Sequence, residues 1–223
     1  MSLGEPREHH ETIGSTNQRA RELAEEGAAH GTLVTAGEQT AGRGRQGRTW
    51  QTPAGVAIAA SVILRDFDEL LPLRAGLAVA DVAGTHALVK WPNDVWIEGK
   101  KVAGILAESR DDWAVLGIGV NVALDPATLP PDVAAIAGTL GRDTSEIEAT
   151  LSELLEHLAQ RLHEPKPETL AALRERDALL GRAVQWDGGH GEGAGIDDGG
   201  GLIVRLDDGT TTTLNAGEVT LTT

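Results

Sequence analysis

Apolar and polar residues alternate along the chain with two different periods, which separate predicted helices from predicted strands. Residues 15–28 are helix formers that open with Ser15 and Gln18 at the spacing of a capping box, and they predict a helix. The run TLVTA at 32–36 predicts a short strand, and the apolar run VAIAASVIL at 56–64 predicts a buried strand. Residues 70–82 predict a helix packed against the sheet that these strands begin.

The middle of the chain is predicted to be rich in strands. The β-type runs, separated by turn residues, are 87–90, 95–98, 101–108 and 114–122. The next segment, 123–142, contains three prolines and predicts an irregular cover over the sheet.

Two further helices are predicted after this cover. Ser145 and Glu148 have the spacing of a second capping box, which would open a helix that runs to about His163. Pro167 would start another helix that ends before Gly181, because proline favours the first turn and glycine the position after the last.

The composition changes after Gly181 to Gly, Asp and Thr with alternating apolar residues. Short strands joined by Asp-Gly turns predict a small barrel of about 40 residues. The chain is therefore predicted to be α+β, with a mixed sheet flanked by helices in residues 1–180 and a small β-barrel in 181–223.

Composition narrows the possible functions. The hydrophobic content of 40% and charged content of 24% are those of a globular protein. The absence of cysteine excludes disulfides, thiolate metal sites and a cysteine nucleophile. The net charge of −15, with four Lys against fifteen Arg, disfavours nucleic acid and anionic membranes as partners. With neither a leader-like start nor an apolar membrane span in the sequence, we expect a cytoplasmic protein.

The first chemical motif is a run of glycines and arginines in 42–48, GRGRQGR. Gly42, Gly44 and Gly47 satisfy the dinucleotide-binding pattern G-x-G-x-x-G, but that pattern requires a helix to begin there. Pro53 and the strand that follows exclude it. The run instead predicts a mobile cationic loop that binds carboxylate or phosphate, with an exposed turn carrying incidental arginines as the less favoured alternative.

The second motif is the pair KWPND at 90–94 and KVAGIL at 101–106. Pro92 should interrupt the strand, so that Asn93 and Asp94 leave the ladder and turn toward a ligand or a metal-bound phosphate. Lys101 would place a point charge near an α-phosphate, while Gly104 would let a ligand lie close to the backbone. Taken singly, these residues are better explained as turn formers and a solvated hairpin lysine.

Two shorter motifs complete the set. In GIGVN at 117–121, glycines inside a strand indicate close approach of another group, and Asn121 offers an amide for base or ribose recognition; a β-bulge is the alternative. In Ser15-Thr16-Asn17, a helix N-terminus offers hydroxyls and N–H groups to a ureido oxygen or an anion. Simple N-capping by Ser15 explains that motif at least as well.

The order and spacing of these motifs from about residue 11 to 122 closely resemble the biotin protein ligase family. The resemblance implies a biotin/lipoate ligase-like catalytic domain in 1–180 and an SH3-like barrel in 181–223. It also implies a monofunctional enzyme without the DNA-binding domain that the repressor members carry. The motifs that carry it are Ser15-Thr16-Asn17, Gln39, 42–50, 90–94, 101–106 and 117–121.

The resemblance also assigns roles to residues. Biotin would be bound by Ser15, Thr16, Asn17, Gln39, Gly42, Arg43, Gly44, Arg45, Trp50, Lys101, Gly104 and Gly117. ATP would be bound by Arg45, Arg48, Asn93, Asp94, Lys101 and Asn121. Lys101, Arg45 and Arg48 would be the catalytic cations, and Mg²⁺ would arrive with ATP near Asp94 without a protein cage of its own.

The implied reaction joins biotin to ATP as biotinyl-5′-adenylate and then transfers biotin to a lysine of a biotin carboxyl carrier protein. ATP, Mg²⁺ and biotin are thus the expected ligands, and the carrier is the expected partner. A homodimer is compatible with the resemblance, while the sequence alone does not fix the oligomeric state. The alternatives are a lipoate or octanoyl protein ligase of the same fold, whose Arg-Arg signature before three glycines is absent here, and a non-enzymatic binding module.

Overall fold

The computed structural model describes residues 3–50, 53–110 and 112–222, and its largest element is a seven-stranded mixed sheet. Along the sheet the strand order is β1-β2-β3-β7-β6-β5-β4, with β1 and β2 parallel and the other neighbours antiparallel. The strands are β1 (Arg7–Ile13), β2 (Leu33–Gln39), β3 (Ala57–Leu64), β4 (Ala87–Lys90), β5 (Asp94–Ile97), β6 (Lys100–Arg110) and β7 (Trp113–Asn121).

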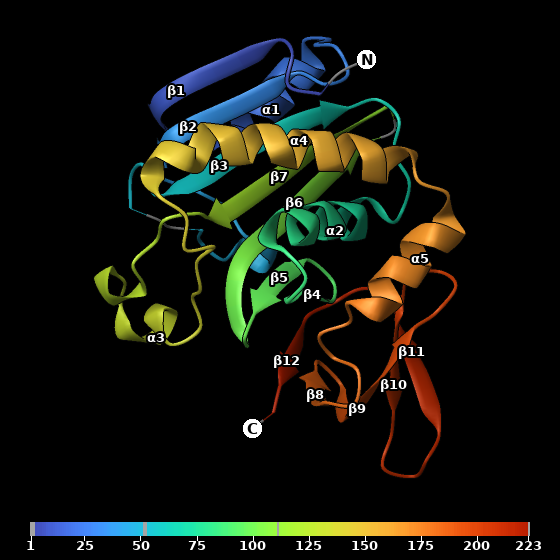
Figure 1. Cartoon of the computed structure of the whole chain (residues 1–223). Helices are drawn as coiled ribbons and strands as arrows, with labels where there is room; N and C mark the ends of the chain where they lie inside the picture. Colours follow the sequence, from blue (N-terminus) through green and yellow to red (C-terminus); the bar gives the residue numbers. More distant parts are fainter. Residues whose placement is uncertain (1–2, 51–52, 111, 223) are drawn as a thin grey trace.

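Helices cover both faces of this sheet. Val62 and Leu64 of β3 belong to the large core beneath α2 and α4, while Ile63 faces the other way and packs with apolar residues of α1. Figure 1 shows α2 and α4 in front of the sheet and α1 behind it. The longer helices are α1 (Thr16–Glu25), α2 (Leu71–Ala83), α4 (Ile147–His163) and α5 (Lys166–Glu175). The predicted α+β class, with a mixed sheet flanked by helices, is confirmed.

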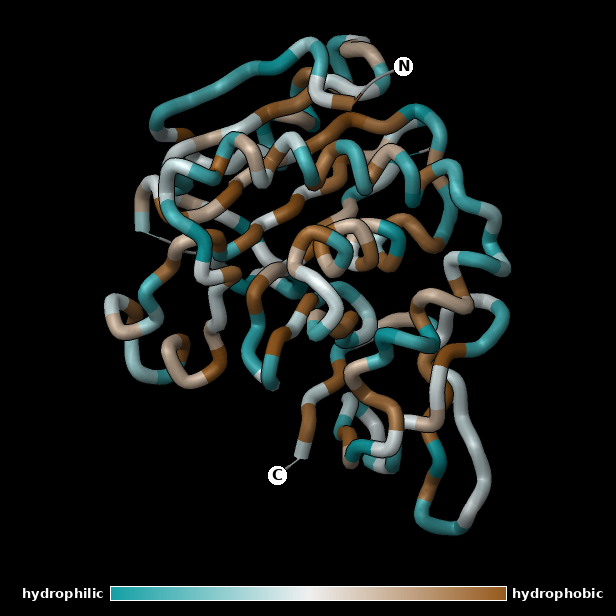
Figure 2. Tube along the Cα trace, in the orientation of Figure 1, coloured by the Kyte–Doolittle hydropathy of each residue, from teal (hydrophilic) through white to brown (hydrophobic). Residues whose placement is uncertain are grey.

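Strand β1 was not predicted. Its sequence REHHETI has no apolar alternation, and Figure 2 shows this edge strand as hydrophilic along most of its length. Backbone pairing holds it in place, from Arg7 beside Leu33 to Ile13 beside Gln39. Arg7 also pairs with Glu148 at the start of α4, with Nη1 2.6 Å from Oε2.

The start of α4 corrects the predicted cap. The capping box consists of Asp143 and Glu146, not Ser145 and Glu148, and a short 3₁₀ turn (Thr144–Glu146) leads into α4. The Asp143 carboxylate accepts a hydrogen bond from Ser145 N at 2.8 Å, and Glu146 accepts one from Asp143 N at 2.7 Å. An aspartate two residues upstream therefore takes the position that the sequence pattern gave to serine.

The last part of the chain forms a five-stranded antiparallel sheet. Its order is β11-β10-β9-β8-β12, and Figure 1 shows it beyond α5 and beside the β4–β5 end of the large sheet. The strands are β8 (Ala183–Trp186), β9 (Gly189–Ile196), β10 (Leu202–Arg205), β11 (Thr211–Leu214) and β12 (Val219–Leu221). The predicted small β unit is thus confirmed as a sheet, while its closure into an SH3-like barrel and the boundary at 181 stay predictions.

Helix α5 has a proline in its first turn and ends at Glu175, so it ends before Gly181 as predicted. Between them, Asp177 forms a bridge with Val89 of β4, and Leu179 is fully buried in the core that both sheets share. Among the described residues no helix is both long and apolar enough to cross a membrane.

Candidate functional site

A pocket of about 660 Å³ lies on the face of the large sheet that carries α1, between the glycine/arginine loop and the strands β6 and β7. Of the predicted site residues, only Gly42 does not line it. Gly42 is buried behind the loop, where its carbonyl accepts a hydrogen bond from Trp50 N at 3.0 Å. The predicted residues that line the pocket are Ser15, Thr16, Asn17, Gln39, Arg43, Gly44, Arg45, Arg48, Trp50, Asn93, Asp94, Lys101, Gly104, Gly117 and Asn121.

One end of the pocket is polar and lies at the N-terminus of α1. Ser15 is the N-cap, and its side chain accepts a hydrogen bond from Gln18 N at 3.4 Å. This confirms the serine half of the predicted capping box, whereas the Gln18 side chain donates to Glu22 Oε1 instead. Gln39, at the end of β2, accepts a hydrogen bond from Thr16 N at 2.9 Å. The first turn of the helix is thereby fixed against the sheet.

Asn17 is held behind this end by other protein groups. Its Nδ2 donates to Glu108 Oε2 at 2.9 Å, and its Oδ1 lies 2.7 Å from Ser61 Oγ. The side chain rests on Gly117, where a Cβ atom would collide with the amide, so β7 must have glycine there. Asn17 is therefore built to orient its neighbours, and its predicted contact with biotin stays a prediction.

The glycine/arginine loop folds back on itself as a short hairpin. Arg43 and Thr49 form an antiparallel bridge, and Gly44 N donates to Arg48 O at 2.7 Å. At the turn between them Gln46 has a positive φ of 54°. The motif contains a single 3₁₀ turn (Arg45–Gly47), and in the described residues between it and β3, 48–50 and 53–56, no helix begins, as predicted.

Two arginines of this loop reach across the pocket. The Arg45 guanidinium donates to Asn93 Oδ1 and to Gly217 O, both at 3.0 Å, and Arg48 forms an ion pair with Glu218. The last two partners belong to the C-terminal sheet and its approach. Sequence motifs gave no sign of these contacts, because they join residues far apart in the chain.

Lys101 provides a third cation opposite the loop. Its Nζ lies 2.7 Å from Asp94 Oδ1 and 5.6 Å from the centre of the Trp50 ring. Trp50 lies flat over the strands: a Cβ atom on Gly119 would lie 2.6 Å from its ring. The indole Nε1 is buried and has no hydrogen-bond partner within the described part of the chain.

Asp94 corrects the expected path of the KWPND motif. It does not leave the ladder but begins β5, where it is paired with Lys90 on one side and Gly104 on the other. Only Asn93 leaves the strand, and its Nδ2 donates to Ile105 O at 2.9 Å. The break between β4 and β5 thus ends at Asn93, one residue earlier than predicted. The Asp94 carboxylate nevertheless contacts Lys101.

The first two residues of the motif attach the C-terminal sheet. Lys90 is buried and donates from Nζ to Val219 O at 2.6 Å, and Trp91 Nε1 donates to Gly200 O at 3.0 Å. Burial lowers the pKa of the Lys90 ammonium group, although the nearby Asp94 carboxylate acts in the opposite direction. Gly217, Glu218 and Val219, which we call the 217–219 segment, therefore contact the pocket residues Arg45 and Arg48 and the buried Lys90.

The segment predicted as an irregular cover forms an apolar wall of the pocket. It contains the short helix α3 (Pro131–Ala134), and Ile136 is 56% exposed. Asn121 lies beneath this wall: its Nδ2 donates to Gly138 O at 2.9 Å, whereas its buried Oδ1 has no partner among the described residues. The lining residues that lie outside the sequence motifs are Leu124, Leu129, Val133, Ile136 and Ala137 of this segment, together with Ala59, Ala60 and Glu218.

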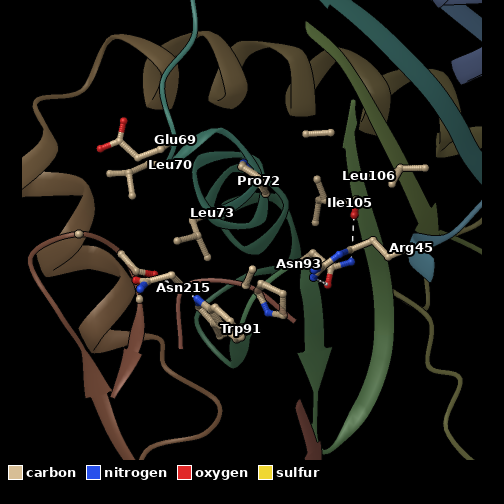
Figure 3. Close-up of a pocket in the computed structure, with 16 residues that line it drawn as sticks. Arg45, Glu69, Leu70, Pro72, Leu73, Trp91, Asn93, Ile105, Leu106 and Asn215 are labelled. Atoms are coloured by element: carbon tan, nitrogen blue, oxygen red, sulfur yellow. Dashed lines mark hydrogen bonds between the residues drawn. The ribbon is translucent and has the colours of Figure 1, made fainter. Parts of the chain in front are cut away.

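A second cavity of about 430 Å³ adjoins the pocket (Figure 3). It lies between the start of α2, residues 105–107 of β6 and the C-terminal sheet, with Leu73, Trp91 and Asn215 in its wall. Arg45, Asn93, Ile105 and Leu106 line both cavities, so the hydrogen-bonded pair of Arg45 and Asn93 is part of the partition between them. In the residues that the structure describes, no three His, Cys, Asp or Glu side chains cluster in a way that could hold a metal.

Comparison with known proteins gives consistent findings. The biotin/lipoate A/B protein ligase family matches residues 10–125. A biotin–[acetyl-CoA-carboxylase] ligase of Mycobacterium tuberculosis is 36% identical over 92% of this chain and 85% of its own length. The bifunctional ligase/repressor BirA of Bacillus subtilis is 38% identical over 158 residues, and this chain spans about half of its length (49%). The structure of an Aquifex aeolicus biotin protein ligase in complex with biotin and ATP is similar with a TM-score of 0.83, 28% identity, and coverage of 98% and 99% of the two chains.

Proposed function

The chain belongs to the biotin/lipoate A/B protein ligase family, and from that premise we propose that it forms biotinyl-5′-adenylate from biotin and ATP and transfers biotin to a lysine of a carrier protein. The comparisons confirm the family and the biotin–protein ligase class predicted from the motifs. The roles of individual residues and the carrier as acceptor are parts of this proposal.

The observation that carries the proposal is the change of polarity along one pocket. At the end near α1 the wall offers neutral, buried polar groups, Thr16 and Asn17, with Gln39 beside them. At the other end it offers the cations Arg45, Arg48 and Lys101. Biotin matches this order, because it has a neutral ureido ring at one end and a carboxylate at the other.

The same observation argues against lipoate as the substrate. A dithiolane ring has neither N–H nor carbonyl groups, so it would add no hydrogen bond to the polar groups that line this end. A hydrogen bond that biotin gains and a dithiolane does not contributes about 0.5–1.5 kcal/mol. Octanoate has the same disadvantage, since its chain is apolar to the end.

The cations would serve the first chemical step, which brings a carboxylate against a polyphosphate. The biotin carboxylate attacks the α-phosphate of ATP, which supplies the adenylyl group, and pyrophosphate leaves. Arg45, Arg48 and Lys101 offset the repulsion between these anions, and no protein nucleophile is needed. The buried, unpartnered Asn121 Oδ1 fits a donor on the base or ribose, beneath the apolar wall that includes Ile136. Asp94 is the carboxylate that would help hold Mg²⁺ with the phosphates.

Trp50 and the loop would protect the product of that step. The adenylate is a mixed anhydride that water destroys, and the indole lies over Gly104 and Gly119 at the middle of the pocket. The amine of an acceptor lysine then takes the acyl group, and AMP leaves.

The test is biotin-dependent release of pyrophosphate from ATP by the purified full-length chain, followed by labelling of a biotin carboxyl carrier domain. Release with biotin and not with lipoate or octanoate is the expected result. Release with lipoate or octanoate alone would favour the alternative ligase. Tight biotin binding without any pyrophosphate would indicate a binding module instead.

A further inference from the structure

Ser61, in the middle of β3, lies behind Thr16 and Asn17 at the polar end of the pocket and has no part in the scheme above. It is fully buried. Its Oγ lies 2.7 Å from Asn17 Oδ1 and 2.8 Å from Thr16 Oγ1. A hydroxyl has a single proton, so Ser61 can donate in only one of these two contacts.

The orientation of the Asn17 amide decides which contact receives that proton. Asn17 Nδ2 donates to Glu108 Oε2 at 2.9 Å and lies 3.4 Å from Leu106 O, and both of those oxygens are acceptors. Turning the amide over would place Asn17 Oδ1 against the Glu108 carboxylate. Asn17 Oδ1 therefore faces Ser61 as an acceptor, and the Ser61 proton belongs to it.

The same reasoning applies to Thr16. Gln39 Oε1 is fixed as an acceptor because Thr16 N donates to it at 2.9 Å. Thr16 Oγ1 lies 2.8 Å from Ser61 Oγ and 3.1 Å from Gln39 Oε1, and it also has one proton. Two hydroxyl protons must thus serve three oxygen–oxygen contacts, so one contact has none.

The shorter contact takes the Thr16 proton, because Ser61 Oγ is closer and its own proton is committed to Asn17. Thr16 Oγ1 and Gln39 Oε1 then face each other as two acceptors 3.1 Å apart. All the groups concerned are buried or half-buried, so the repulsion between these oxygens is poorly screened. An N–H donor entering between them would relieve it.

We propose that Ser61 is a positioning residue that makes Thr16 Oγ1 an acceptor for an N–H group of the ligand ring. The inference rests on the proposed function, in which the donor is a ureido N–H of biotin. The hydroxyl relay from Thr16 through Ser61 to Asn17 sets the direction, and Glu108 anchors it. Ser61 thereby contributes to the selection of a ring that carries N–H donors.

The experiment measures binding of biotin alone to the full chain by isothermal titration calorimetry. Ser61→Ala frees the Thr16 proton to turn to Gln39, so biotin should bind about five- to ten-fold more weakly while ATP binds as in the wild type. A double-mutant cycle with Thr16→Val separates a role through Thr16 from a general loss of packing: Ser61→Ala should change biotin affinity little once Thr16 has no hydroxyl.

Thr35→Val is the matched control, because Thr35 is a buried hydroxyl residue on the adjacent strand whose contacts are to Arg7 and His9. It should change the melting temperature without changing biotin affinity. Should Ser61→Ala fail to fold, Ser61→Cys keeps a weak donor of similar size and replaces it in the cycle, with an expected affinity between those of serine and alanine.

Unchanged biotin affinity in Ser61→Ala, or additive losses in the cycle, would overturn the relay and leave the proposed ligase standing. A folded wild-type chain that does not bind biotin at all would instead overturn the proposed function.

Discussion

Lys100 and Lys101 are neighbours in the chain with different partners. Lys101 Nζ faces Asp94 and Trp50 inside the pocket, whereas Lys100 is exposed and donates to Ala135 O. We expect Lys101→Gln to lower the rate of adenylate formation by about 10²–10³, as for removal of one preorganised charge partner at a reacting oxyanion. Lys100→Gln has the same change of charge and should keep a rate close to that of the wild type, with pyrophosphate release as the measurement. Equal rates in the two variants would remove Lys101 from the site.

Arg45 has a different role, because it lies between the two cavities and donates to Asn93 there. Arg45→Gly should speed release of biotinyl-adenylate into solution while the melting temperature changes little, since an irregular loop contributes little to global stability. Gln46→Gly is the control, because it adds similar backbone freedom at an exposed neighbour and keeps the guanidinium. Adenylate trapping by gel filtration measures the release, and equal retention in Arg45→Gly and the wild type would contradict the closing-loop role.

Most pocket residues were predictable because each motif places residues that are unusual for its predicted element. The glycines of β7, for example, lie inside an otherwise apolar strand. Ser61 was missed although it is the only polar residue in the apolar run 56–64, which was itself a signal. The contacts of Arg45 and Arg48 with the 217–219 segment could not be predicted from the sequence. Local spacing does not determine which distant group a long side chain contacts.

At the scale of elements, the start of α4 offers a direct comparison of two candidate caps. Asp143→Ala should lower the melting temperature, because the carboxylate accepts from Ser145 N, while Ser145→Ala should have little effect. The same hydrogen bond lowers the pKa of Asp143, so the cap's contribution is complete above the carboxyl's unfolded pKa and is lost as pH falls through the folded one. Thermal unfolding of both variants at neutral and acidic pH checks this. A larger loss in Ser145→Ala would show that the predicted cap was right.

The elements that the sequence predicted are those with an apolar face, such as β3 and α2. β1 was missed because both of its faces are mainly polar and its stability comes from pairing with β2. The segment around α3 was predicted only as an irregular cover. That its exposed Val133 and Ile136 line a pocket depends on which part of the sheet they lie over, and the local sequence does not specify this.

The whole molecule carries a net charge of −15 with fifteen Arg and four Lys, a composition expected where high salt screens self-repulsion. An acidic protein from a GC-rich genome is the equally weighted alternative. At about 0.15 M salt the Debye length is roughly 8 Å, and at 1 M it is about 3 Å. We expect the melting temperature to rise with KCl up to molar concentrations while biotinylation persists. A flat melting temperature together with a collapse of activity would exclude salt adaptation.

The ion pair between Arg48 and Glu218 links two parts of the molecule that are usually considered apart. In the proposed function Arg48 binds a phosphate, and the donors used there would no longer be available to Glu218. Glu218 directly precedes Val219, the first residue of β12. Nucleotide binding and docking of the C-terminal sheet would therefore be coupled. If nucleotide weakens docking by a given free energy, docking must weaken nucleotide binding by the same free energy. Saturating ATP should speed amide hydrogen exchange in β12 and leave β10 unchanged, and Glu218→Gln should abolish that response. Slower exchange in β12 with ATP would mean that the nucleotide and the sheet cooperate rather than compete for the arginine.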